Sequence, residues 1–104
     1  MAANYEAVKA AAIQYADDVR RVMNIDKAVL FGSYAKGTAE DGSDVDVCFF
    51  FPAGNGANRL DVIGELVKMT RRRSVPFEPI AFPTSEIERG NPFVREVLST
   101  GVEI

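Results

Sequence analysis

The stretch LFGSYAKGTAEDGSDVDVCFFF, residues 30–51, contains the most informative pattern of this chain. An apolar run ends at Gly32 and Ser33, ten mostly polar residues follow, and Asp44-Val-Asp46 opens a second apolar run. Gly32 permits a tight turn from a strand into a helix. The alternation of a strand would place Asp44 and Asp46 on one face, roughly 7 Å apart. Because Mg²⁺ prefers oxygen ligands and also grips phosphates, the pattern predicts a metal and nucleotide site.

Two other loop motifs fail on their spacing. An EF-hand beginning at Asp44 would need an oxygen ligand where Cys48 stands. The two glycines of GSYAKGT, residues 32–38, resemble a Walker A loop, but Thr38 occupies the position of its lysine. A carboxylate in a strand that continues with Cys48 and Phe50 is costly unless its charge is compensated, and a divalent metal would compensate it.

The composition predicts one folded domain over residues 1–104, with 47% hydrophobic and 26% charged residues. The net charge of −3 provides no general attraction for polyanions, so we do not expect nucleic acid as the main partner. Cys48 is the only cysteine and lies within an apolar run, which favours a buried side chain and a reducing compartment. We expect a cytoplasmic protein without a membrane span, because the sequence shows neither a signal peptide nor a long apolar stretch.

Hydrophobic periodicity predicts alternating helices and strands. The fold class is α/β or α+β, with a small mixed sheet of three to four strands and helices mainly on one face. Pro76 and Pro79 favour an edge position for the third strand. The expected elements are a helix over 4–23, a strand over 27–31, a helical turn over 33–36, a strand over 44–51, a helix over 58–73, a strand over 75–83, a short helix over 85–89, a helix ending before Gly101, and a small strand over 102–104.

The combination of Gly32-Ser33, ten residues and Asp44-x-Asp46, within this order of elements, resembles the minimal nucleotidyltransferases of the polymerase-beta-like superfamily. The resemblance covers the whole chain and implies the fold of that superfamily. It implies that Gly32, Ser33 and adjacent backbone amides hold the terminal phosphates of a nucleotide. It also implies that Asp44 and Asp46 bind two Mg²⁺ ions, and that a carboxylate on a neighbouring strand completes the site.

Glu78 is the only well-placed third carboxylate, although the family more often has Asp there; its alternative is an exposed residue on an edge strand. Lys36 would pair with the triphosphate or lie in solvent. Tyr34 would stack on a base or fill the turn. The basic run Arg71–Arg73 favours a solvated helix end, with contact to a triphosphate, an RNA end or an acidic partner as the alternative.

The resemblance implies transfer of a nucleoside monophosphate, AMP from ATP, to a hydroxyl of a partner macromolecule. Stand-alone minimal members resemble antitoxins that adenylylate a HEPN-domain ribonuclease toxin, so a HEPN toxin is the expected partner. The alternatives are a catalytically weak antitoxin that neutralises its partner by binding, and a small-molecule nucleotidyltransferase. The sequence contains no motif for base selection, and homo-oligomers and hetero-oligomers remain open.

Overall fold

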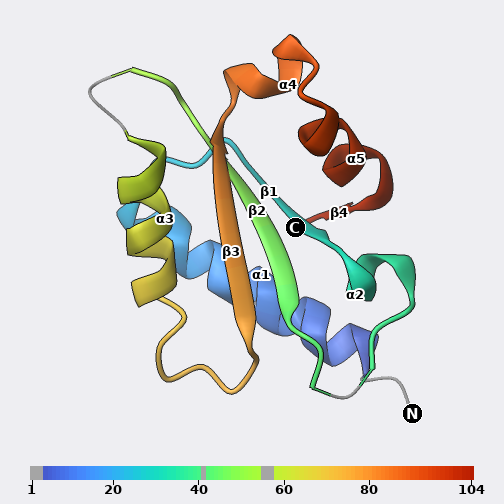
Figure 1. The fold of residues 1–104 in the computed structure, drawn as a ribbon. Coiled ribbons are helices and arrows are strands. Elements are labelled where there is room, and N and C mark those ends of the chain that lie inside the picture. The colour runs from blue at the N-terminus through green and yellow to red at the C-terminus, as the bar shows by residue number, and fades with distance from the viewer. Residues whose placement is uncertain (1–3, 41, 55–57) are drawn as a thin grey trace.

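The computed structural model describes residues 4–40, 42–54 and 58–104, which form a four-stranded sheet with helices around it (Figure 1). The order of elements agrees with the order that the sequence predicts. The elements are α1 (Tyr5–Val22), β1 (Lys27–Phe31), α2 (Ser33–Lys36), β2 (Val45–Phe51), α3 (Arg59–Lys68), β3 (Phe77–Pro83), α4 (Ser85–Arg89), α5 (Pro92–Thr100) and β4 (Val102–Glu103).

The strands are arranged in the order β3-β2-β1-β4. β1 runs antiparallel to β2 and to β4, whereas β2 and β3 run parallel, so the sheet is mixed as expected. β3 lies at an edge of the sheet. Pro79 has no backbone N–H to donate, and at an edge this does not remove a hydrogen bond between central strands. The mixed topology places the beginnings of β2 and β3 beside the end of β1.

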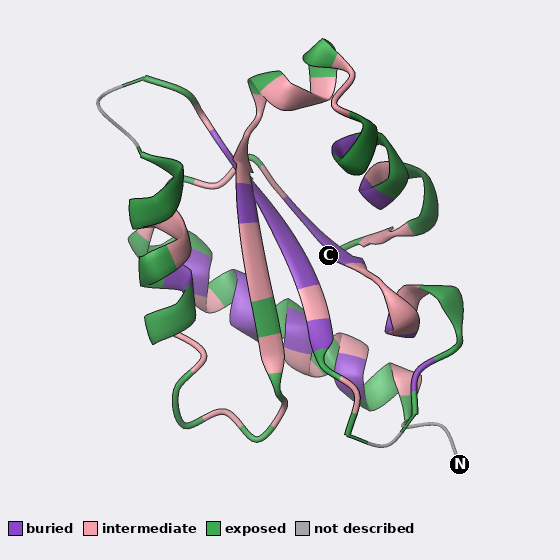
Figure 2. Ribbon diagram, in the orientation of Figure 1, coloured by how far each residue is buried: buried purple, intermediate pink, exposed green. Residues whose placement is uncertain are grey.

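One face of the sheet packs against α1 and α3 and contains the larger part of the core. Alternate residues of β2 point to this face and are buried with Leu30 of β1 and Leu66 of α3. The Tyr15 hydroxyl of α1 donates a hydrogen bond of 2.7 Å to the Leu66 carbonyl, which ties the two helices together. Figure 2 shows buried residues on α1 where it crosses behind the strands, and on the strands themselves. The buried β2 residues of this face are Val45, Val47, Phe49 and Phe51.

The opposite face of the sheet is partly covered by α5. The sequence predicts helices mainly on one face, and α5 is an additional helix on the other face. Val94 and Val97 of α5 pack with Cys48 and Phe50 of β2. Burial raises the pKa of the Cys48 thiol to about 12, so this cysteine is an unreactive core side chain, as expected. The beginning of β2 extends beyond this apolar cluster, and Asp46 lies there on the same face as Cys48.

Three expected boundaries are wrong by a few residues. β2 begins at Val45, so Asp44 directly precedes the strand, and β3 begins at Phe77 rather than at residue 75. α3 ends at Lys68, not near residue 73. The chain turns after Lys68, and Arg72 has a φ of 67°, a left-handed conformation that an α-helix cannot include.

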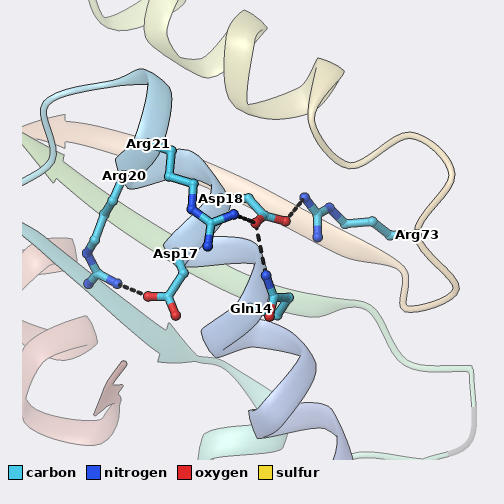
Figure 3. A network of polar contacts seen from close by, with 6 residues as sticks. All are labelled: Gln14, Asp17, Asp18, Arg20, Arg21 and Arg73. Carbon is cyan, nitrogen blue, oxygen red and sulfur yellow. Dashed lines mark hydrogen bonds and ion pairs between the residues drawn. The ribbon is translucent and has the colours of Figure 1, made fainter.

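The side chain of Arg73 ties the end of this turn to α1, as Figure 3 shows. Its guanidinium forms an ion pair of 2.9 Å with Asp18 and lies 4.9 Å from the centre of the Tyr15 ring. Its Nε donates a hydrogen bond of 2.7 Å to the Met69 carbonyl. Arg71 and Arg72 are exposed, so the basic run predicted as solvated is solvated only in part. Within the described residues, no helix combines the length and apolar character needed to span a bilayer.

Candidate active site at the start of β2 and β3

Gly32 forms the turn between β1 and α2 and lies directly against Asp46. Its φ of 78° and ψ of −150° belong to a region that is essentially restricted to glycine. A Cβ atom at this position would collide with the carboxylate of Asp46. The Gly32 carbonyl accepts the hydrogen bond of 3.0 Å from the Lys36 N–H that closes α2. The glycine therefore allows the start of α2 and the second aspartate to approach closely.

Strand pairing brings the predicted third carboxylate beside the second aspartate. Asp46 of β2 is the register partner of Phe31 on one side and of Glu78 on the other. Asp44 directly precedes the strand and is exposed, Asp46 is half-buried, and Glu78 is exposed. The three acids that the sequence singles out thus gather at one end of the sheet.

The acids influence one another's protonation. Burial raises the pKa of the Asp46 carboxyl, and the negative charge of Asp44 raises it further. A hydrogen bond with Asp44 raises the pKa of the Glu78 carboxyl, and the charges of Asp44 and Asp46 add to this shift. Among the described residues, no Lys or Arg forms an ion pair with any of the three. Within the described ranges, the three acids thus have no direct ion-pair partner.

This set of donors has the chemistry that Mg²⁺ requires. Carboxylate oxygens are its preferred protein ligands, and the raised pKa values show that a cation would be favourable here. The side chains nevertheless do not stand in a coordinating arrangement: within the ranges that the structure describes, no three His, Cys, Asp or Glu side chains are close enough to hold one ion. Asp44, Asp46 and Glu78 fit the metal by composition and placement, and coordination would require them to move closer together.

The remaining predicted residues lie on α2. Ser33 is half-buried at the first position of the helix, next to Gly32. Lys36 is exposed and its ammonium forms an ion pair of 3.5 Å with Glu96 of α5. Tyr34 is buried in the core with α1, so it fills the turn and does not stack on a base.

Sequence reasoning missed three residues that line the cleft beside the acids. The cleft has a volume of about 390 Å³, and its walls include Asp46 and Glu78 together with Phe31, Arg59 and Phe93. The Arg59 side chain lies 4.1 Å from the centre of the Phe82 ring and donates a hydrogen bond of 2.6 Å to the Ala81 carbonyl. Only Phe31 had a local signal, its place directly before Gly32-Ser33. Arg59 and Phe93 come to the cleft through the packing of α3 and α5.

Two solved structures share this fold. A crystal structure from Sulfolobus solfataricus, of a protein assigned as a nucleotidyltransferase, matches with a TM-score of 0.67 and 23% identity, over 89% of this chain and 75% of that chain. A toxin–antitoxin structure with AMP-PNP matches with a TM-score of 0.53 and 18% identity, over 97% of this chain and 72% of that chain. At these identities the two structures show the fold alone. None of the curated proteins matches the chain.

A comparison with sequence models of protein families identifies the type of domain. The sequence model of the nucleotidyltransferase domain matches residues 13–98, which include the Gly32-Ser33 turn, both aspartates and Glu78. The match extends from within α1 to within α5 and so covers most of the fold. The chain belongs to the nucleotidyltransferase domain family.

Proposed function

We propose that this chain transfers a nucleoside monophosphate, AMP from ATP, to a hydroxyl group of a partner protein. The observation that carries the proposal is the meeting of Gly32, Asp46 and Glu78, which joins a phosphate-binding turn to a group of uncompensated acids. Such groups with shifted pKa values are typical of functional sites.

Each residue has a distinct role in this reaction. Gly32 and Ser33 hold the terminal phosphates, while Asp44, Asp46 and Glu78 would hold Mg²⁺. The metal, when bound, would neutralise phosphate charge and polarise the bond to the leaving group. Glu78 also accepts the proton of the acceptor hydroxyl, since its carboxylate is exposed beside Asp46 and lines the cleft. The acceptor oxygen bonds to the α-phosphorus, the bond to the β-phosphate oxygen breaks, and pyrophosphate leaves.

The partner proposal rests on the toxin–antitoxin structure that shares the fold, together with the resemblance to antitoxins of HEPN toxins. The test incubates the chain with Mg²⁺, α-labelled ATP and a small helical protein encoded beside it. We expect covalent label and the mass of one AMP on the partner. Asp46→Asn should abolish both, while Asp17→Asn, an exposed acid of α1, should leave them unchanged. Equal labelling by Asp46→Asn would reject the assignment.

A second candidate function is neutralisation of the partner by binding alone. The observation that favours it is the spacing of the acids, which forms no three-ligand cluster within the described residues. Stoichiometric inhibition of the partner, without any change in its mass, would establish this function in place of nucleotidyl transfer.

A further inference from the structure

Three phenylalanines form an aromatic wall beside the acids. The ring of Phe93, at the start of α5, lies edge-on to Phe31 with 5.8 Å between ring centres. The same ring is tilted against Phe82, also at 5.8 Å. Phe31 and Phe82 are partly buried against the cluster beneath α5, so the wall is continuous with a packed core. Phe93 therefore has a fixed support on two sides.

Phe93 is nevertheless 45% exposed, although two aromatic rings flank it. It lines the cleft of about 390 Å³ that contains Asp46 and Glu78. With Phe31 it also lines a second cleft, of about 190 Å³, that contains Gly32 and Lys36. Phe31 and Phe93 thus line both the cleft beside the Gly32 turn and the cleft beside the acids.

We propose that the nucleobase of the bound nucleotide stacks on the exposed surface of Phe93. This inference rests on the proposed function. A nucleotide with its terminal phosphates at Gly32 and its α-phosphate at Asp46 would span both clefts, since Gly32 lines one and Asp46 the other. Phe93 is the exposed aromatic ring that lines both. Stacking is worth about 1–3 kcal/mol per base and tolerates every base, since each has a π-face.

The base fits this wall better than the acceptor does. It is tethered to the phosphates and must lie near them, whereas a hydroxyl of a partner protein approaches from the open side, where Glu78 is exposed. The guanidinium of Arg59 already lies against Phe82 and leaves Phe93 as the available ring of the wall. Binding through this ring predicts weak discrimination between nucleotides that differ only in the base.

The chain contains no tryptophan, so Phe93→Trp introduces a single fluorescent reporter that keeps an aromatic ring. Leu60→Trp, at an exposed position of α3 that lines neither cleft, is the matched control. With Mg²⁺ present, ATP, GTP, CTP and UTP should each quench Phe93→Trp, and inorganic triphosphate should not. Neither type of compound should quench Leu60→Trp. Equal quenching of Phe93→Trp by inorganic triphosphate would overturn the inference.

The second part of the experiment measures, by calorimetry, the nucleotide affinities of variants that carry no tryptophan. Phe93→Leu, which keeps apolar packing, and Phe93→Ala should bind ATP about 5- to 150-fold more weakly than the wild type, with unchanged affinity for inorganic triphosphate. Unchanged ATP affinity in both variants overturns the stacking inference alone, and a raised KM for the acceptor would then assign the wall to the acceptor. A wild-type chain that binds neither ATP nor inorganic triphosphate overturns the proposed function as well.

Discussion

Two groups of acids on this domain have opposite electrostatic surroundings. Asp18 of α1 accepts hydrogen bonds from Arg73 and Gln14, and these hold the pKa of its carboxyl below the usual value (Figure 3). Asp46 and Glu78 lie beside other acids, and the pKa of each carboxyl is raised. An acid with its own counterion stabilises the fold, whereas acids gathered without one leave their charge available to a ligand. The contrast separates a structural ion pair from a candidate active site.

Removal of the Glu78 charge should have the largest effect on the transfer rate, and so tests most strongly whether the acids form an active site. If Glu78 accepts the acceptor proton and completes the metal site, Glu78→Gln should lower the transfer rate by about 10²- to 10⁴-fold. Glu78→Asp should keep part of the rate, because it retains the carboxylate. Glu88→Gln, on the exposed surface of α4, is the control and should behave as the wild type. Steady-state transfer assays measure the effect, and a wild-type rate for Glu78→Gln would show that Glu78 is an ordinary edge-strand acid.

Gly32 tests whether the active-site end depends on close backbone packing. Gly32→Ala should destabilise the fold by about 1–3 kcal/mol, since φ is 78° and the added Cβ would displace the Asp46 carboxylate. Gly64→Ala in α3 meets no atom within 4 Å and should stabilise the fold by about 0.5–1 kcal/mol. Urea unfolding of both variants gives the comparison. A loss of stability equal in the two would mean that Gly32 is not constrained by Asp46.

The structural ion pair is tested within the basic run itself. Arg73→Ala should cost about 1–2 kcal/mol, because it removes a hydrogen bond to Met69 and the contact with the Tyr15 ring. Arg71→Ala, at an exposed position, should change stability by less than about 0.5 kcal/mol. Thermal unfolding should separate the variants by roughly 4–8 °C per kcal/mol. Equal melting temperatures would remove the structural role assigned to Arg73.

The smallest expected effects are opposite slopes of stability against pH in the metal-free protein. Asp46 has a raised pKa, so its unfolded form ionises first as the pH rises from about 4, and stability falls until the folded pKa is passed. Asp46→Asn should therefore be more stable than the wild type above that window, by about 1 kcal/mol or less, because the half-exposed charge is screened by solvent.

Asp18 should behave in the reverse sense. Its lowered pKa contributes stability that is present above the unfolded value of about 3.9 and lost as the pH falls through the folded value. Asp18→Asn should thus be less stable than the wild type near neutral pH and should approach it in acid. Melting curves in EDTA would compare both variants, and a shift of the same sign for Asp46→Asn and Asp18→Asn at neutral pH would contradict the contrast.

Local signals explain what the sequence predicted well. The spacing from Gly32 to Asp46 and the period of the flanking elements are short-range properties, so the elements and their order followed from them, whereas the pairing of Asp46 with Glu78 was expected from the family resemblance. Long-range packing explains the rest. Arg73 finds Asp18 across 55 residues of sequence, and Phe93 reaches the cleft only because α5 folds over the second face of the sheet. Neither contact leaves a pattern near the residue itself.

Ligand-induced stabilisation of the wild type and Asp46→Asn tests the central claim most directly, because it needs no acceptor. The melting temperature of each is measured with Mg²⁺, with a non-hydrolysable ATP analogue, and with both. The wild type should be stabilised strongly only by the combination, by about 2.7 kcal/mol at 100 times the dissociation constant, and Asp46→Asn should gain almost nothing. An equal gain by Asp46→Asn would show that the acids at the start of β2 do not hold the metal-bound nucleotide.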